Sequence, residues 1–340
     1  MQQQLLQQDG FLEITRRARR NRKSSALRAL IQETRLHPSH FVAPFFVIDD
    51  LDKKIPITSM PGVFRFGIES LLKEIEANLQ LGIRAINLFC YTTEEKKDSL
   101  ATEATRQGNL LQRAIATIKK ELPEVLVMAD IALDPFTDHG HDGIVDDAGS
   151  ILNDPTIVIL AEMALRAAEA GCDIVSPSDM MDGRIGFIRK ALDSNGFHQV
   201  SILSYAVKQA SSFYGPFRDA LDSAPKFGDK KTYQMSPANV REALLECMLD
   251  EEEGADMLLV KPAITNLDII AKVRAMTNLP LGAYQVSGEY AMIKAAHEKG
   301  VLDEKKAFLE TLTAIKRAGA DFIVTYAAKD ACEALKRYEF

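Results

Sequence analysis

The sequence predicts an α/β protein, a (β/α)8 TIM barrel with an extended N-terminal arm. Eight short apolar runs recur along the 340 residues, and segments with helical periodicity separate them. Strands that are apolar throughout indicate a parallel sheet buried beneath helices. The eight runs occupy residues 41–48, 85–90, 125–133, 173–178, 201–207, 256–262, 281–287 and 322–327.

The segments between these runs predict helices that end at glycines. Examples are "IESLLKEIEANLQLG" and "TIVILAEMALRAAEAG", whose apolar residues recur at helical spacing. A Gly just past a helix is typical of a left-handed C-cap. Eight such units fit a closed barrel better than the alternative, an eight-stranded open sheet. No G-x-G-x-x-G or Walker loop follows any run, which disfavours a dinucleotide-binding sheet further.

The domain organisation predicted is an arm over residues 1–38 and a barrel over residues 39–340. The arm carries the basic run "TRRARRNRK". The formal net charge of −7 does not suggest a nucleic-acid binder, so we expect this run to be a solvated arm or a subunit contact rather than a nucleic-acid site. Long insertions near residues 134–156 and 208–236 follow the third and fifth runs, and we expect them to be lid loops.

Composition gives an expectation for the compartment. No apolar run approaches the roughly 18 residues of a membrane span, and "MQQQLLQQDG" lacks the pattern of a signal peptide. The four cysteines are widely spaced and form no C-x-x-C, which is typical of reduced thiols. We therefore expect a cytoplasmic protein without a membrane partner.

Polar side chains end six consecutive strands. In a barrel, the carboxyl ends of the strands form one rim, where active sites lie. Two ammonium groups there would repel, lowering the pKa of at least one, and a neutral lysine amine forms Schiff bases with carbonyl substrates. Alternatively, either lysine binds an anion; the pair, facing a serine and a tyrosine, favours imine chemistry on a keto compound. The six residues are Asp130, Ser178, Lys208, Lys261, Ser287 and Tyr326.

Both long loops carry candidate ligands. "ADIALDPFTDHGHDG" concentrates carboxylates and imidazoles, a donor set that suits a hard cation such as magnesium, although a polar loop with turn-capping residues is the alternative. The loop over residues 208–236 supplies cations and aromatic rings, which could clamp a carboxylate and exclude water. Its members are Arg218, Lys226, Lys230, Lys231, Phe213, Tyr214 and Phe217.

Five motifs in order closely resemble the porphobilinogen synthase (delta-aminolevulinic acid dehydratase) family, from near Arg20 to the eighth strand. The resemblance implies a (β/α)8 barrel whose arm wraps a neighbouring subunit, usually in a homo-octamer. It also implies a hydro-lyase that condenses two 5-aminolevulinate molecules to porphobilinogen, with loss of water, in haem and tetrapyrrole synthesis. The motifs are "DPFTDHGHDG", "PSDMMDGR", "SYAVKQASSFYGPFRDA", "ADMLLVKPAITNLDI" and "YQVSGEYAM".

The resemblance implies a role for each candidate residue. Lys261 is similar to the Schiff-base lysine for the substrate that provides the propionate side chain, and Lys208 to the lysine of the second imine. Ser287 and Tyr326 resemble the pair that holds the first substrate's carboxylate.

Further roles concern the lid and the pocket floor. Arg218 and Lys230 resemble the lid cations for the second carboxylate, and Phe213 belongs to the same lid. Lys at position 230 keeps the charge of the Arg found in some relatives but loses its bidentate fork. Asp130 and Ser178 resemble floor residues that hold the substrate amine or a reacting water.

The expected metal follows from the same resemblance. Zinc-dependent members carry three cysteines where this chain has Ala132, Asp134 and Asp142. The chain thus resembles the aspartate-rich branch, which implies no catalytic zinc but magnesium or a monovalent cation. Asp134 and Asp142 are candidate ligands, and Glu246 is similar to the glutamate of an allosteric magnesium site.

Three other functions remain open from the residues alone. A class I aldolase would need only one imine lysine. A non-catalytic binding barrel would be expected to lack a lysine, Ser287 or Tyr326. A nucleic-acid role for the basic arm would require salt-sensitive binding to a duplex.

Overall fold

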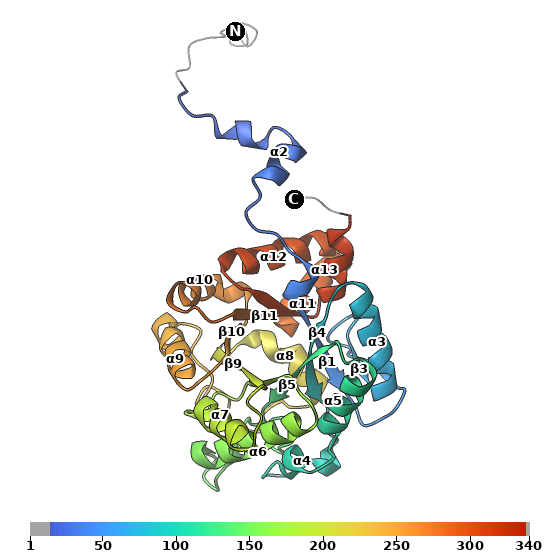
Figure 1. Cartoon of the computed structure of the whole chain (residues 1–340), viewed down its shortest axis with the longest axis vertical. Coiled ribbons are helices and arrows are strands. Elements are labelled where there is room, and N and C mark those ends of the chain that lie inside the picture. Colours follow the sequence, from blue (N-terminus) through green and yellow to red (C-terminus); the bar gives the residue numbers. More distant parts are fainter. Residues whose placement is uncertain (1–13, 338–340) are drawn as a thin grey trace, which may run out of the picture.

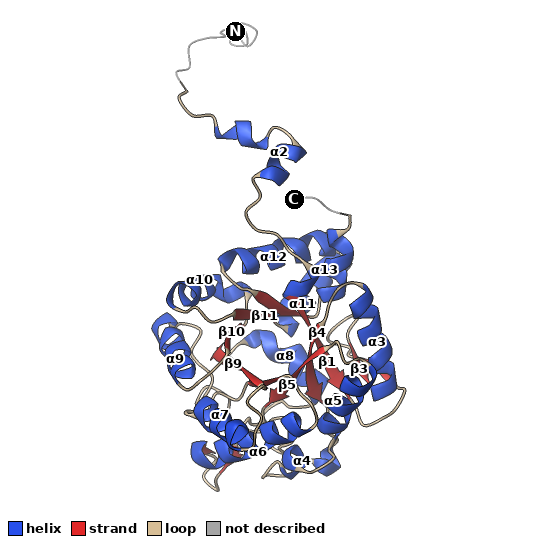
Figure 2. Cartoon of the chain, viewed as in Figure 1, coloured by secondary structure: helices blue, strands red, loops and turns tan. Residues whose placement is uncertain are grey.

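Eight parallel strands surrounded by helices form the body of the protein in the computed structural model, which describes residues 14–337 (Figure 2). Each strand coincides with one of the eight apolar runs. The strands are β1 (Phe41–Val47), β4 (Ala85–Cys90), β5 (Leu126–Ile131), β8 (Ile174–Pro177), β9 (Ser201–Lys208), β10 (Met257–Lys261), β11 (Leu281–Gln285) and β12 (Phe322–Thr325).

The sheet closes on itself. Strand β12 pairs in parallel with β1, with Phe41 opposite Ile323 and Val42 opposite Val324. The remaining strands follow in the order β1, β4, β5, β8, β9, β10, β11, β12. The (β/α)8 prediction is therefore confirmed and the open sheet is wrong, because an open sheet would leave β1 and β12 as unpaired edges.

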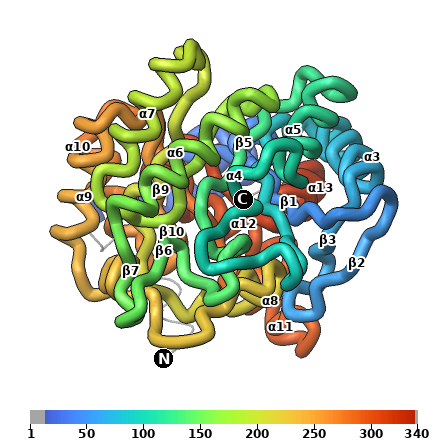
Figure 3. The backbone as a smooth tube through the Cα atoms, turned by 90° about the horizontal axis from the view of Figure 1, so that it is seen from below, coloured from blue at the N-terminus to red at the C-terminus, as the bar shows by residue number. Residues whose placement is uncertain are grey.

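Helices on the outside cover the barrel, and Figure 3 shows α3, α7, α9 and α10 at its periphery. Helix α3 buries Ile68, Leu71 and Ile75 on one face, as its periodicity predicts. Gly171 follows α6 with φ of 96°, a value that favours glycine. The helices are α3 (Ile68–Gln80), α4 (Thr102–Thr105), α5 (Leu110–Glu121), α6 (Asn153–Glu169), α7 (Arg184–Ser194), α9 (Val240–Glu252), α10 (Leu267–Met276), α11 (Ser287–Glu298), α12 (Glu304–Ala318) and α13 (Ala328–Leu335).

Both insertions are folded over the barrel. The first contains a small hairpin of β6 (Ile144–Val145) and β7 (Ile151–Leu152), and the second contains α8 (Gly215–Leu221). A further hairpin of β2 (Lys54–Pro56) and β3 (Phe64–Phe66) extends the sheet beside β1. The two expected lids therefore form ordered structure above the strand ends.

The described part of the arm extends away from the barrel (Figure 1). It forms a short 3-10 helix (Ala18–Arg22) and α2 (Ser25–Leu30), and neither buries any residue. Residues 1–13 of the predicted arm lie outside the described residues. Leu30, at the end of α2, is 77% exposed.

Cys90, Cys172, Cys247 and Cys332 are all buried and unbonded. Within residues 14–337, none of the helices combines the length and apolar content needed to cross a bilayer.

Candidate active site

Lys208 and Lys261 end the neighbouring strands β9 and β10 and lie directly opposite each other in the register. Register partners in parallel strands project to the same side of the sheet, so both side chains enter the barrel mouth. They are 6% and 5% exposed. The structure thus brings the two predicted lysines together.

Aromatic rings surround the amine of Lys261. Its Nζ lies 4.9 Å from the ring centroid of Tyr284, 5.0 Å from those of Tyr214 and Phe217, and 5.3 Å from that of Tyr205. Burial, followed by repulsion from Lys208, lowers the pKa of Lys261 from 10.5 to about 7. Near neutral pH a large fraction of Lys261 is therefore the free amine, the nucleophilic form.

Lys208 has more polar surroundings than Lys261. Its Nζ donates a hydrogen bond to the Ser178 carbonyl oxygen at the end of β8. The Oδ1 atom of Asp142 lies 3.7 Å from the same nitrogen. These contacts aim the Lys208 side chain at the loop that follows β8.

A lid lysine joins the two aspartates that were predicted as metal ligands. The Nζ atom of Lys230 lies 3.4 Å from Asp134 and 3.2 Å from Asp142, and all three residues are buried. Burial alone would lower the pKa of Lys230, but the attraction of the two carboxylates outweighs it and raises the pKa. Burial likewise acts to raise the pKa of Asp142, but Lys208 and Lys230 outweigh it and hold the pKa below the ordinary value.

Asp130 is the carboxyl group suited to proton transfer at neutral pH. Burial raises its pKa to about 7, and a hydrogen bond from the Ser178 side chain opposes part of this rise. A group with a pKa near the working pH can both give and take a proton. Lys261 and Lys208 are close enough for their charges to act on Asp130.

These side chains border one small cavity of about 20 Å³. This volume is close to the space of a single water molecule, so the lid covers the mouth in this structure. Seven of the predicted site residues line this cavity, and Asp142 and Ser287 contact residues of its lining. The lining consists of Asp130, Asp134, Ser178, Lys208, Tyr214, Phe217, Arg218, Lys230, Gln234 and Lys261.

Ser287 and Phe213 lie where the lid meets α11. The Ser287 hydroxyl donates to the Phe213 carbonyl oxygen (3.2 Å) and accepts from the Phe217 N–H (3.0 Å). Gly288 permits this approach, because a Cβ atom there would lie 2.6 Å from the Phe213 carbonyl oxygen. Ser287 therefore fastens the closed lid, and lid opening would free its hydroxyl.

Tyr326 lies behind the aromatic rings that surround Lys261. Its hydroxyl accepts a hydrogen bond from Tyr284 at 2.9 Å, and its ring stacks on Phe46 with centroids 6.0 Å apart. Tyr326 does not border the 20 Å³ cavity. The predicted pair therefore lies on two sides of the site: Ser287 contacts the lid, and Tyr326 contacts Tyr284 in the ring cluster.

Of the other candidate residues in the two loops, Lys226 and Lys231 lie on the surface and His141 lies between the loops. Lys226 pairs with Glu94 at 3.2 Å and Lys231 with Asp229 at 2.8 Å, both on the surface. The two nitrogens of His141 contact the Tyr233 hydroxyl (3.1 Å) and the Phe227 carbonyl oxygen (3.0 Å) of the lid. His141 thus joins the two loops.

Glu246 borders a second cavity, about 560 Å³ in volume, between the two lids and α9. Asp182 and Glu242 also line it. Burial and the neighbouring Asp250 raise the pKa of Glu246, so a bound cation would offset an unfavourable buried charge. Within residues 14–337, no three His, Cys, Asp or Glu side chains gather closely enough to hold a metal alone. The carboxylates fit magnesium only as an ion that keeps several waters, which is its usual mode.

Sequence reasoning missed two groups of residues. Tyr205 and Tyr284 surround Lys261, yet strands buried on both faces give no periodicity that tells which residues face the barrel interior. Arg184, at the start of α7, is fully buried with Asp179 and Asp250. In the sequence it ends the motif "PSDMMDGR", but nothing there names its partners.

Comparisons with known proteins agree with this geometry. The family model for delta-aminolevulinic acid dehydratase matches residues 15–334. Delta-aminolevulinic acid dehydratase of Chlamydia pneumoniae is 52% identical over 97% of this chain and 99% of its own length. That of Bacillus subtilis is 50% identical over 93% of this chain and 97% of its own length.

A solved structure is similar in fold along nearly the whole chain. It is delta-aminolevulinic acid dehydratase (porphobilinogen synthase) from Toxoplasma gondii in complex with the reaction product porphobilinogen. Its TM-score is 0.94 with 49% sequence identity, and the match covers 97% of this chain and 96% of that chain.

Proposed function

The chain belongs to the delta-aminolevulinic acid dehydratase family, and we propose that it makes porphobilinogen through imines on Lys261 and Lys208. As a member of this family it is a hydro-lyase that condenses two 5-aminolevulinate molecules in tetrapyrrole and haem biosynthesis. One observation carries the proposal: the two lysines are register partners at the mouth of the barrel, and the pKa of Lys261 is about 7.

The first imine forms on Lys261. Its free amine attacks the keto carbon of one 5-aminolevulinate, giving a carbinolamine, and loss of water leaves the imine. The departing hydroxyl needs a proton, and Asp130 with a pKa of about 7 can supply it. The surrounding rings exclude water and disfavour the charged form of the lysine.

The second imine forms on Lys208 with the other substrate. The Ser178 carbonyl oxygen and Asp142 hold this amine beside Lys261, so the two bound substrates lie next to each other. Holding both reactants in one pocket replaces a bimolecular encounter with an intramolecular step. Formation of the carbon–carbon and carbon–nitrogen bonds then releases both lysines as free amines.

The substrate carboxylates need cationic or hydrogen-bonding partners. Arg218 and Lys230 on the lid are the partners we assign to the Lys208-bound molecule. Ser287 and Tyr326 are the partners we assign to the carboxylate of the Lys261-bound molecule, and Phe213 lies beside them in the lid. Because the closed cavity holds about 20 Å³, the lid must open for substrate entry, which frees Ser287 from its bonds to the lid.

Magnesium is the cofactor we propose, bound at Glu246 with Asp182 and Glu242 nearby. When bound there it would neutralise carboxylates beside the lid and act allosterically. Asp134 and Asp142 are weaker ligand candidates, because Lys230 already balances their charge. A monovalent cation stays a prediction, as does the expectation of no catalytic zinc.

We also propose a homo-octamer joined through the N-terminal arm, located in the cytoplasm. The exposed apolar side chains of Leu30 and Ile31, at the end of helix α2, which buries none of its residues, support a contact with a partner subunit. Four unbonded cysteines support a reducing compartment.

The test is chemical trapping. Borohydride reduces an imine to a stable amine, so incubation with 5-aminolevulinate and borohydride, followed by intact mass and peptide mapping, marks each reacting lysine. We expect adducts on Lys261 and Lys208, and none without substrate. An active sample without an adduct on either lysine would reject the imine mechanism.

A further inference from the structure

Arg184 is a fully buried arginine that the proposed reaction does not use. It is 1% exposed and does not border the active-site cavity. Its guanidinium forks onto Asp250 of α9, with Nη1 and Nη2 each 3.2 Å from one carboxylate oxygen. Its Nε atom lies 3.6 Å from Asp179, which follows the end of β8. Arg184 therefore bridges two buried carboxylates from different parts of the barrel.

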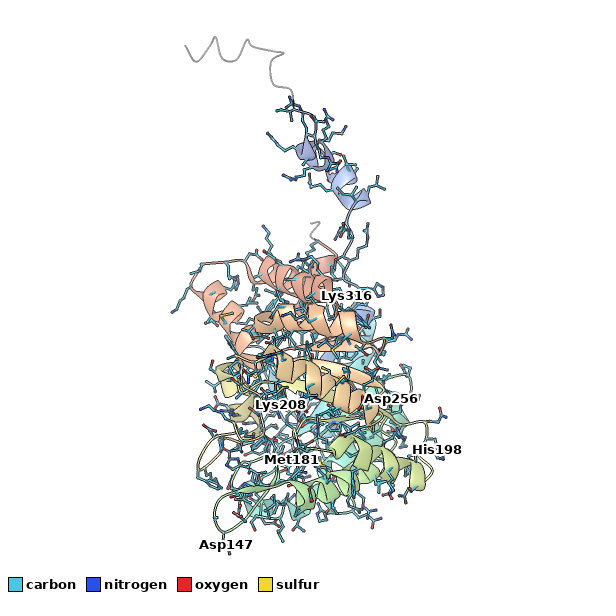
Figure 4. All side chains as sticks on the ribbon, turned by 90° about the vertical axis from the view of Figure 1, so that its left-hand side faces the viewer. Asp147, Met181, His198, Lys208, Asp256 and Lys316 are labelled. Atoms are coloured by element: carbon cyan, nitrogen blue, oxygen red, sulfur yellow. The ribbon has the colours of Figure 1, made fainter. Side chains whose placement is uncertain are left out.

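The Asp179 side of this bridge leads to Lys208 in two steps. Asp179 directly follows Ser178, whose carbonyl oxygen accepts the hydrogen bond from Lys208 Nζ. The other carboxylate oxygen of Asp179 accepts from the Met181 N–H at 2.7 Å, which closes the turn after Ser178. Figure 4 labels both Met181 and Lys208.

This turn is strained. Met180, at its centre, has φ of 75°, a left-handed conformation that is unusual for a side chain other than Gly or Asn. Such a residue persists only where its surroundings determine the backbone, and it costs on the order of 1–3 kcal/mol. Asp179 supplies part of that constraint through the Met181 N–H, and Arg184 adds to it by donating from Nη1 to the Met181 carbonyl oxygen at 3.3 Å and by its ion pair with Asp179.

The other side of the bridge holds the strand that carries Lys208. Arg184 Nη2 donates to the Ser204 hydroxyl at 3.3 Å and to the Tyr205 carbonyl oxygen at 3.4 Å. Both residues belong to β9, which ends at Lys208. Ser204 also donates to Asp250. The Arg184 guanidinium thus contacts both β9, which carries Lys208, and the turn after Ser178, whose carbonyl oxygen accepts the hydrogen bond from Lys208.

We propose that Arg184 is a positioning residue for Lys208: it fixes the Ser178 carbonyl oxygen against β9, so that the Lys208 amine points at the second substrate. This inference rests on the proposed imine at Lys208. Buried ion pairs add little net stability compared with apolar packing, but their geometry is strongly directional. The ion pairs of Arg184 can therefore orient the Lys208 amine. This orientation matters because a small misplacement of a reacting group slows the reaction steeply.

The variant that tests this is Asp179→Asn. It keeps the Oδ1 acceptor for the Met181 N–H and the side-chain volume but removes the charge facing Arg184. Asp173→Asn is the matched control. Asp173 directly precedes β8, the strand that Asp179 follows, and it also combines an ion pair (with Lys119, 2.8 Å) with a hydrogen bond from a backbone N–H (Val127). Arg184→Lys and Arg184→Met complete the series, one keeping the charge without the fork and one removing both.

The readout is the ratio of borohydride adducts on Lys208 and Lys261 with 5-aminolevulinate, measured beside thermal unfolding. For Asp179→Asn and Arg184→Met we expect the rate of Lys208 trapping to fall on the order of 100-fold, with Lys261 trapping retained. Arg184→Lys should recover part of the Lys208 signal, and Asp173→Asn should match wild type.

Two results would overturn the inference while leaving the proposed function intact. One is a wild-type adduct ratio in Asp179→Asn and Arg184→Met. The other is an equal loss of both adducts in proportion to the loss of folded protein, which would mean a purely structural role. If wild type itself forms no adduct on Lys208, the proposed function fails at that lysine, and the inference fails with it.

Discussion

Lys208 and Lys261 lie opposite each other on adjacent parallel strands, and only Lys261 is surrounded by aromatic rings. This difference separates the two amines chemically. Burial and repulsion lower the pKa of Lys261 to about 7, whereas Lys208 contacts the Ser178 carbonyl oxygen and Asp142. The two lysines thus have distinct environments, as an asymmetric condensation of two identical substrates requires.

Replacing the amine of Lys261 tests its covalent role. Lys261→Met keeps the apolar stem within the ring cluster but cannot form an imine, so we expect folded protein with turnover reduced by at least about 10⁴-fold. The measurement is porphobilinogen formation alongside circular dichroism. Lys272→Met, an exposed lysine on α10, is the control and should keep full activity. Near-native turnover of Lys261→Met would disprove the assignment.

The repulsion between the two lysines can be measured through pH. A lowered lysine pKa means that the free amine is lost as pH falls through about 7, and about one tenth remains at pH 6. Lys208→Met removes the repulsion, so the pKa of Lys261 rises and its trapping profile moves to higher pH. Reductive trapping with cyanoborohydride between pH 5 and 10, followed by peptide mapping, gives the midpoint. An unchanged midpoint would show that burial acts alone.

Lys230 should matter for stability as well as for substrate binding. Lys230→Met leaves Asp134 and Asp142 buried without their shared cation, and breaking such a pair costs about 3–5 kcal/mol. Urea unfolding should show this loss of free energy, together with an increase in KM. Lys231→Met alters the neighbouring exposed lysine and should change stability by less than about 0.5 kcal/mol. Equal effects of the two substitutions would contradict the buried triad.

The arm can be tested with one apolar position. Leu30 is 77% exposed on α2, and we expect it to pack against a partner subunit. Leu30→Asp should therefore reduce the mass measured by light scattering after size-exclusion chromatography. Val301→Asp changes an equally exposed residue on the barrel, 75% exposed, and should leave the mass unchanged. An unaltered assembly in Leu30→Asp would exclude this contact.

Magnesium should act through Glu246. Removal of metal with EDTA should lower the activity of wild type, and magnesium should restore it. Glu246→Gln removes the charge at the second cavity, so its activity should no longer respond to magnesium. Glu252→Gln, an exposed residue on the same helix, should respond as wild type does. A normal response in Glu246→Gln would place the ion elsewhere.

The strands were predictable because their signal is local. Each apolar run coincides with a strand, since a parallel strand buried on both faces needs apolar residues throughout. Lysines at the ends of β9 and β10 were recognisable for the same reason, because a charge that follows an apolar run is unusual. The shared mouth of Lys208, Lys261 and Asp130 then followed from the barrel alone.

Local patterns did not reveal which partner each charge finds. Asp134 and Asp142 were candidate metal ligands, and only the structure shows that Lys230, 96 residues after Asp134, forms ion pairs with both. Likewise, nothing in the sequence pairs Arg184 with Asp179 and Asp250, between which it is buried. Such pairings join segments that are distant in the chain, so no periodicity encodes them.

The sequence by itself determined the barrel, its eight strands and the two amines at its mouth, because burial and strand geometry act over a few neighbouring residues. Only the tertiary structure decided the rest: the register that sets Lys208 opposite Lys261, the rings around Lys261, and the ion pairs of Arg184 with Asp179 and Asp250. The physical reason is that a pKa and the direction of an amine depend on every group packed around it. Those groups come from strands, helices and a lid that meet only when the chain folds.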